Sequence, residues 1–274
     1  MDDLLANPAF QASVAPFFVA LVAGFLLKYV GWYWAGLAVM LGFYASVSLI
    51  TGFEFTPLTS TRKVVLLGMI AVAVGLLLDL FTIKRQYLLS LLAITGAAAL
   101  LWVIWPPLMR MEGQAFWLYA AGGIAYVVWL MLSLEGLRSR PLRADAATLT
   151  LSLGTGIAAL IGASALLGQL ASSLAAALGA FLLLSVIKKT LPVGFVMMLP
   201  VTLLSGLIGM SGLVYAKLPW YSLSILALTP LLARIPLPKR LPLWGQALAL
   251  VAATAPAAAG AIYVALKIAG APPI

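Results

Sequence analysis

The residues best suited to chemistry in this chain are a few polar groups inside long apolar runs. Asp79 is the one acidic residue that the pattern places clearly within such a run, VVLLGMIAVAVGLLLDL. Burying an ionised carboxylate near the bilayer centre costs about 3 kcal/mol on insertion scales, so a carboxylate kept there is by default a functional candidate. Asp79 is therefore the candidate proton-coupling residue. The alternative is an ion pair at the helix end with Lys84 or Arg85.

Two pairs of neighbouring residues combine a hydroxyl with a residue that weakens helices, namely Thr95–Gly96 and Thr229–Pro230. Interrupted membrane helices expose backbone groups to a solute near the middle of the bilayer. These four residues are therefore candidates for substrate binding. The alternative is structural, because Gly and Pro are tolerated in membrane helices and a Thr hydroxyl can bond to a carbonyl of its own helix.

Tyr126 and Tyr263 each follow a run of small residues, AAGG and AAAG. Small residues let a neighbouring helix approach closely, so the two tyrosines are candidates for lining a central cavity and binding a substrate there. Packing is the alternative for both. For Tyr263, a place in the aromatic belt at the membrane surface is a further alternative.

Several kinds of chemistry lack the residues they need. The chain contains neither Cys nor His, which excludes disulfides, thiolate chemistry and the usual ligands of zinc or haem. It also has no paired carboxylates and no nucleophile beside a base, so we expect neither an enzyme nor a metal or other cofactor. GTGIAALIG is not a nucleotide-binding loop, because no strand precedes it, and its small residues indicate tight helix packing instead.

The composition identifies the class of protein. Of the 274 residues, 64% are hydrophobic and 8% are charged, and the mean hydropathy is +1.15. These values are typical of an integral membrane protein whose main partner is the lipid bilayer. Apolar runs of about 20 residues cross a membrane as helices, and the alternating pattern of an outer-membrane barrel is absent. The predicted fold class is all-α, a polytopic membrane helix bundle.

The apolar runs predict about ten transmembrane helices, at 10–29, 32–50, 64–81, 87–105, 116–134, 148–167, 170–187, 193–215, 220–235 and 243–266. Pro106 and Pro107 are predicted to end the fourth, because paired prolines cannot continue a helix. The polar stretch EGLRSRPLRADA, 135–146, is predicted to be a cytoplasmic linker.

The two halves of the chain resemble each other. Segment 36–50 aligns without a gap with segment 173–187, six of the fifteen positions are identical, and the offset of 137 residues is half the chain. Two further pairs align at the same offset, 64–77 with 201–214 and 120–128 with 257–265. We therefore expect two five-helix repeats, 1–134 and 147–274, joined by the linker.

The basic residues predict the orientation. Eleven of the sixteen Lys and Arg residues fall in loops on one side and five on the other, and the richer side is expected to be cytoplasmic. Both termini are then periplasmic, in agreement with Asp2 and Asp3, and the second repeat crosses in the opposite sense to the first. The predicted location is a bacterial inner membrane. Because the net charge of +9 lies in short loops, it does not imply a nucleic-acid partner.

Inverted repeats are a recurrent design of secondary transporters. In topology the chain resembles the ten-helix, five-plus-five carriers of the drug/metabolite transporter superfamily, and the resemblance rests on no sequence motif. It implies a transporter or exporter of a small neutral or weakly charged metabolite that works by alternating access. The alternatives are a non-catalytic structural subunit of a larger membrane complex, and a channel or lipid-handling protein. A homodimer and neighbouring subunits remain open as partners.

Overall fold

A computed structural model describes residues 7–81, 83–162, 164–187, 191–238 and 240–269, and within these ranges the chain forms helices and no strand. Five residues used to predict the orientation lie outside the described residues: Asp2, Asp3, Lys188, Lys189 and Lys239.

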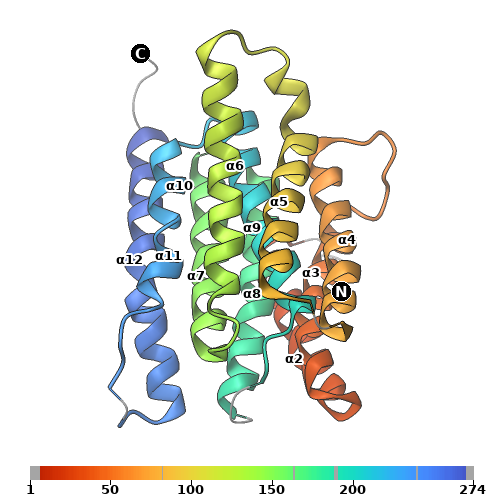
Figure 1. Cartoon of the computed structure of the whole chain (residues 1–274), viewed down its shortest axis with the longest axis vertical. Coiled ribbons are helices and arrows are strands. Elements are labelled where there is room, and N and C mark those ends of the chain that lie inside the picture. The colour runs from red at the N-terminus through yellow and green to blue at the C-terminus, as the bar shows by residue number, and fades with distance from the viewer. Residues whose placement is uncertain (1–6, 82, 163, 188–190, 239, 270–274) are drawn as a thin grey trace.

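The helices follow the apolar runs of the sequence (Figure 1). The first half contains η1 (Phe10–Val14), α2 (Ala15–Val30), η2 (Trp32–Gly36), α3 (Leu37–Ile50), α4 (Ser60–Leu80), α5 (Arg85–Leu108) and α6 (Gln114–Glu135). The second half contains α7 (Pro141–Gly162), α8 (Ala165–Ile187), α9 (Phe195–Ala216), α10 (Trp220–Leu226), α11 (Thr229–Leu232) and α12 (Leu243–Ala269).

Eight helical stretches in the described part of the chain are long and apolar enough to cross a membrane, with 21 to 26 residues each. Two further apolar stretches, Trp34–Ile50 and Trp220–Leu232, are shorter. The predicted all-α class is therefore confirmed, and the protein is a multi-pass membrane protein.

The helices around the chain midpoint differ from the predicted ones. Helix α7 begins at Pro141, so the second part of the stretch predicted to be a linker, 135–146, is helical. Proline is well suited to the first turn of a helix, where its missing N–H is not needed. The next connection falls between Gly162 and Ala165, several residues before the predicted one, so α7 is displaced towards the amino terminus as a whole.

The paired prolines do not end α5, which continues through them to Leu108. Without N–H groups, Pro106 and Pro107 cannot bond to the carbonyls four residues earlier, those of Trp102 and Val103. Both carbonyls accept hydrogen bonds from other helices instead: Lys63 Nζ donates to Trp102 O at 3.1 Å, and Tyr215 Oη donates to Val103 O at 2.7 Å. The prediction of a break at this point is wrong because neighbouring helices satisfy the freed carbonyls.

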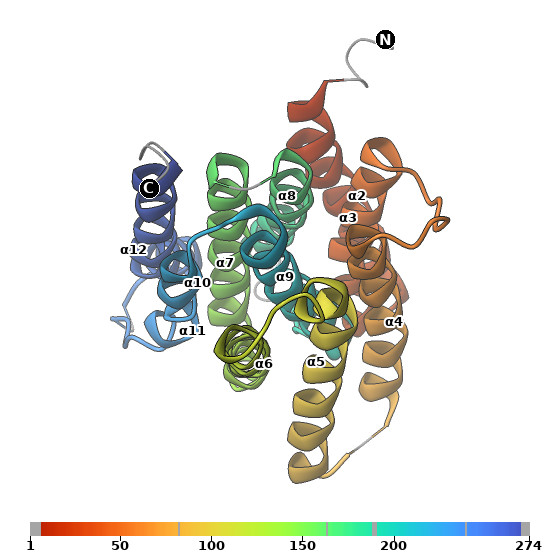
Figure 2. The ribbon, with the colours of Figure 1, turned by 90° about the horizontal axis from the view of Figure 1, so that it is seen from above.

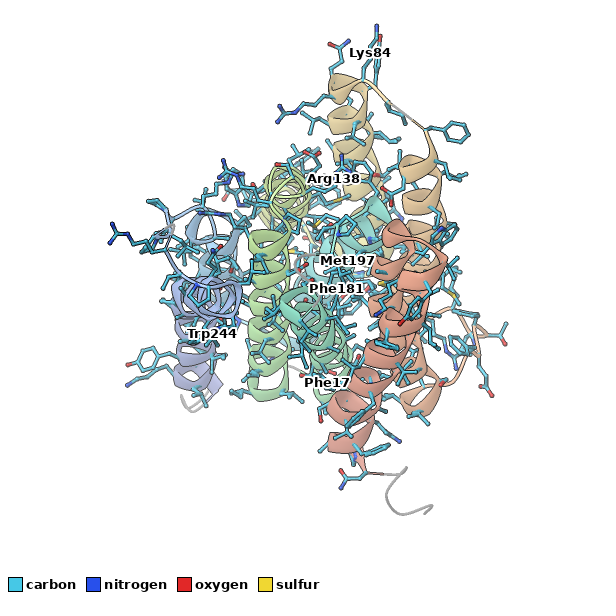
Figure 3. All side chains as sticks on the ribbon, turned by 90° about the horizontal axis from the view of Figure 1, so that it is seen from below. Phe17, Lys84, Arg138, Phe181, Met197 and Trp244 are labelled. Atoms are coloured by element: carbon cyan, nitrogen blue, oxygen red, sulfur yellow. The ribbon has the colours of Figure 1, made fainter. Side chains whose placement is uncertain are left out.

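Helix α9 forms the centre of the bundle, and its residues from Phe195 to Gly212 are all buried. It packs against α3, α4, α5, α6, α7, α8 and α10. Viewed from above, α12 and α4 lie at opposite edges, with α9 between them (Figure 2). Figure 3 shows Phe181 of α8 and Met197 of α9 inside the bundle, where both are fully buried, whereas Trp244 of α12 lies on the outside. The core is therefore filled by side chains around α9.

Close contact between α4 and α9 depends on a glycine. A Cβ atom on Gly75 of α4 would lie 2.5 Å from the carbonyl oxygen of Phe195 and 2.8 Å from Cα of Val196. Because lipid gives helices no hydrophobic reason to associate, such contacts between small residues are a main source of packing energy in a membrane. Gly154 of α7, in the GTG segment, lies in the same way against Leu226 and Ala258, which confirms the packing role predicted for that segment.

Candidate functional site

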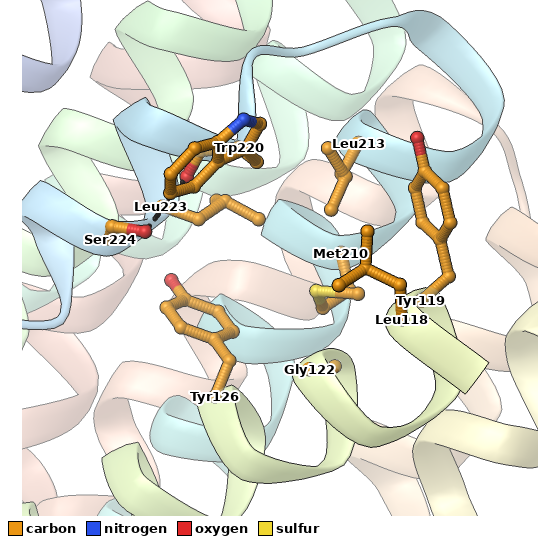
Figure 4. Close-up of a pocket in the computed structure, with 10 residues that line it drawn as sticks. Leu118, Tyr119, Gly122, Tyr126, Met210, Leu213, Trp220, Leu223 and Ser224 are labelled. Carbon is orange, nitrogen blue, oxygen red and sulfur yellow. Dashed lines mark hydrogen bonds between the residues drawn. The ribbon is translucent and has the colours of Figure 1, made fainter. Parts of the chain in front are cut away.

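A cavity of about 360 Å³ lies between α6, α9 and α10 (Figure 4). This volume is at the lower end of the range for small-molecule sites. The cavity is lined by Leu118, Tyr119, Gly122, Gly123 and Tyr126 of α6, Met210 and Leu213 of α9, and Trp220, Leu223 and Ser224 of α10. No Asp, Glu, Lys or Arg side chain is among these described lining residues.

The polar groups of the cavity are few, and one of them is unused. The hydroxyl of Tyr126 is buried and has no hydrogen-bond partner in the described part of the protein. It points towards α10 (Figure 4), and a Cβ atom on Gly209 of α9 would lie 3.5 Å from it. The hydroxyl of Ser224, by contrast, donates to the carbonyl of Trp220 at 3.2 Å. A buried hydroxyl without a partner is unfavourable. A hydrogen bond from a bound molecule to Tyr126 would therefore contribute more binding free energy than a hydrogen bond to an exposed hydroxyl.

Glycine creates the space on the α6 side. A Cβ atom on Gly122 would meet no heavy atom within 4 Å, whereas one on Gly123 would collide with Met210 and Leu100. The missing side chain of Gly123 therefore lets α6 pack closely against α9. The missing side chain of Gly122 leaves the neighbouring space open as part of the cavity. On the α10 side, the indole ring of Trp220 stacks on the ring of Tyr221 with 3.8 Å between centroids, and Trp220 is 56% exposed. The indole therefore lies at the mouth of the cavity.

The helix that supplies Trp220 is interrupted. Helix α10 ends at Leu226 and α11 begins at Thr229, directly before Pro230. The N–H of Leu231 bonds to Leu228 O, so the carbonyl of Ala227 is free of a helical bond and accepts from Trp129 Nε1 of α6 at 2.8 Å. The same helix, α6, thus lines the cavity and stabilises the break beside it.

The six residues predicted to bind substrate lie in different places. Tyr126 lines the cavity. Thr229 and Pro230 are buried at the start of α11, where the hydroxyl of Thr229 has no partner among the described atoms, but they do not line the cavity.

The other three predicted residues lie away from the cavity. Thr95 is exposed, and its hydroxyl donates to Leu91 O of its own helix at 2.7 Å. Gly96 packs against Met131 of α6. Tyr263 is 59% exposed, and Lys267 Nζ lies 5.6 Å from the centre of its ring. The structure therefore brings only Tyr126 of the six to this cavity.

Asp79 holds the start of α9. Its two carboxylate oxygens accept the backbone N–H groups of Phe195 at 2.8 Å and Val196 at 2.9 Å. The ion pairs of the described residues, Arg62–Glu54 and Arg138–Glu135, do not include it. A carboxylate at a helix N-terminus satisfies free N–H groups and complements the helix dipole. The proton-coupling role of Asp79 stays a prediction, but both of its oxygens already have structural partners.

Sequence reasoning missed Asp145, which lies in α7 and is fully buried. The residue falls in a polar stretch that resembles a linker, and Pro141 was the available signal, because proline often occupies the first turn of a helix. Trp220 and Met210 of the cavity were also missed, since aromatic and Met residues in an apolar run carry no mark of a cavity.

The chain matches no protein-family model, and no curated protein matches its sequence significantly. Its function is therefore inferred from the cavity and from the helices around it.

Proposed function

We propose that this protein is a secondary transporter or exporter of a small neutral or weakly charged metabolite, acting in a bacterial inner membrane. The observation that carries the proposal is an apolar cavity beside an interrupted helix, with the Tyr126 hydroxyl buried in its wall and without a partner among the described atoms. A site of this kind can hold a molecule and is placed next to a segment whose backbone is not locked by regular helical bonds.

The cavity walls favour one class of solute. Leu118, Met210, Leu213 and Leu223 supply apolar contact, and Trp220 supplies an aromatic face. A molecule with an apolar body and one hydrogen-bonding group would match these walls and the Tyr126 hydroxyl. A strongly ionic solute would lose its hydration without gaining a counter-charge, because the described lining contains none.

Alternating access is the proposed mechanism, and two repeats of opposite orientation are its proposed basis. In support, α4 and α9 correspond in the sequence repeat and pack extensively against each other, as helices next to a pseudo-two-fold axis would. The neighbours of the first long helices differ, since α7 packs along α12 whereas α2 packs mainly on α3 and α8. The two halves are therefore packed differently within the bundle.

Reconstitution tests this proposal. Purified protein in liposomes is offered a panel of small neutral and weakly charged metabolites, with and without a proton gradient. We expect at least one solute to be taken up by the wild type, and uptake to be lost in Gly122→Leu, whose new side chain fills the cavity. Ala125→Leu adds three carbon atoms, one fewer than Gly122→Leu, to an exposed position of α6 that does not line the cavity, so it should transport normally. Uptake by Gly122→Leu at the wild-type rate would show that the solute passes elsewhere.

A structural subunit of a larger membrane complex is the second candidate. It is favoured by the outward face of α12, where the small residues Ala252, Ala255 and Ala259 are exposed and could lie close to another membrane helix. Affinity purification from native membranes separates the two proposals. A stoichiometric partner lost on Ala255→Leu, together with no transport by the isolated chain, would favour the subunit.

A further inference from the structure

Asp145 is a buried acid with one unused oxygen. Its side chain is 0% exposed, and its Oδ2 accepts from the hydroxyl of Ser185 on α8 at 3.0 Å. Its Oδ1 is buried and has no hydrogen-bond partner in the described part of the protein. An ionised carboxylate in such surroundings needs a cation or several donors, and here one neutral hydroxyl is present.

No described cation lies within ion-pair distance of this carboxyl. Arg143, two residues earlier, donates to the carbonyls of Ala233 and Ile235 at 2.7 and 3.0 Å. Arg138 is near Glu135 and the ring of Phe195. Lys188 and Lys189 lie outside the described residues.

The helices packed against α7 offer little charge. They are α6, α8, α9, α10, α11 and α12, and their acidic and basic residues are Glu135 of α6 and Lys267 of α12. Their other titratable residues are the tyrosines Tyr119, Tyr126, Tyr215, Tyr221 and Tyr263. None of these described groups bonds to Asp145, so no charged group in the described part of the chain balances an ionised form of this carboxyl.

A row of buried polar residues on α7 runs from Asp145 towards the cavity. Asp145, Thr148, Ser152 and Thr155 are all buried and are spaced by three or four residues, which places them on one side of the helix. Ser152 shares a hydrogen bond of 2.9 Å with Ser205 of α9. The methyl group of Thr155 lies 3.7 Å from a Cβ position on Gly209, the residue that also adjoins the Tyr126 hydroxyl, while the Thr155 hydroxyl donates to Leu151 O at 2.8 Å. At 1.5 Å per residue, the two ends of this row are about 15 Å apart.

We propose that Asp145 binds and releases the proton that couples to solute movement through the cavity. The carboxylate takes up one proton from water to become the neutral acid and returns it as the conformation changes, and no other bond forms or breaks. The Ser185 hydroxyl serves both forms, because it can donate to the carboxylate or accept from the acid. The coupling part of this inference rests on the proposed transport function, whereas the proton binding does not.

Infrared difference spectroscopy on the purified protein at varied pH tests proton binding directly. We expect a carbonyl band of a protonated carboxyl that titrates with pH, is absent from Asp145→Asn and persists in the control Asp79→Asn. Ser185→Ala should move the band to higher frequency, since the acid loses its hydrogen bond, and it provides a readout if Asp145→Asn does not fold. A band that survives in Asp145→Asn, or no such band in the wild type, would overturn the proposal.

Transport measurements then separate coupling from binding. In Asp145→Asn, uptake driven by a proton gradient should be lost, while exchange of labelled for unlabelled solute across the liposome should continue. Gradient-driven uptake at the wild-type rate in this variant would refute the coupling role. If no solute is transported by any form, the transport proposal fails, and the infrared band still decides whether Asp145 binds a proton.

Discussion

The carboxylate of Asp79 on α4 lies 2.8 Å from the backbone N of Phe195 and caps the first turn of α9. The central helix of the bundle is therefore tied at its start to the helix against which it packs most extensively. Gly194 makes this approach possible, because a Cβ atom there would lie 2.5 Å from Asp79 Oδ2.

Replacing Asp79 should mainly lower the stability of the protein. We expect Asp79→Ala to lower the free energy of unfolding by about 1–2 kcal/mol, because two N–H groups lose their acceptor. Asp79→Asn, which keeps one acceptor oxygen, should cost less. Denaturation in detergent measures both, with Glu54→Gln as the control, since the Glu54 side chain is 82% exposed and its removal should change little. Loss of transport in Asp79→Asn at normal stability would instead support the predicted proton-coupling role.

Tyr126 and Tyr215 should respond differently to loss of the hydroxyl. Tyr126→Phe removes a hydroxyl that has no partner among the described residues, so stability should stay the same or rise, while solute binding should fall. Tyr215→Phe removes the donor to Val103 O and the acceptor of Ser60 Oγ, and should cost about 1–2 kcal/mol. Melting curves and a binding assay on both variants check this, and a clear loss of stability in Tyr126→Phe would mean that its hydroxyl has a structural partner.

Trp129→Phe should loosen the break between α10 and α11. The substitution keeps an aromatic ring but removes the N–H that bonds to Ala227 O, at a cost of about 1 kcal/mol. Hydrogen exchange should then increase in residues 226–232. Trp117→Phe on the same helix is the control, because that ring is 70% exposed. Equal exchange in the two variants would show that the indole does not hold the break.

Two glycine-to-alanine substitutions separate packing from open space. Gly75→Ala places a methyl group against the backbone of α9 and should destabilise the protein by about 1–3 kcal/mol. Gly122→Ala places the same group in the cavity and should not lower stability, because the new Cβ meets no atom within 4 Å. Thermal unfolding of the two purified variants is the measurement, and similar losses in both would contradict the close contact between α4 and α9.

Most of the helical segments were predictable, because the signal for a membrane helix is local. The length of an apolar run decides whether it can span the membrane as a helix. Helices α4 and α6 can therefore be recognised without information from distant residues. The same local reasoning failed at Pro106 and Pro107. Whether a proline ends a helix depends on the groups that replace its hydrogen bond, and these come from Lys63 and Tyr215, far away in the sequence.

The candidate site was harder to predict for the same reason. Tyr126 was found through its small neighbours, and the pair Thr229–Pro230 did mark an interrupted helix. Thr95 of the similar pair in the first half bonds to its own helix and is exposed. Asp145 was not recognised because the polar residues of 135–146 are typical of a loop. The residue is interior because α8, α9 and α12 pack around α7.

The end of α5 carries an implication for biogenesis. The carbonyl of Val103 receives its hydrogen bond from Tyr215, 112 residues later in the chain. A ribosome makes α5 long before α9, so during synthesis this carbonyl must stay in contact with water or lipid headgroups. The final turn of α5 is therefore expected to become stable only when the second half of the protein has entered the membrane.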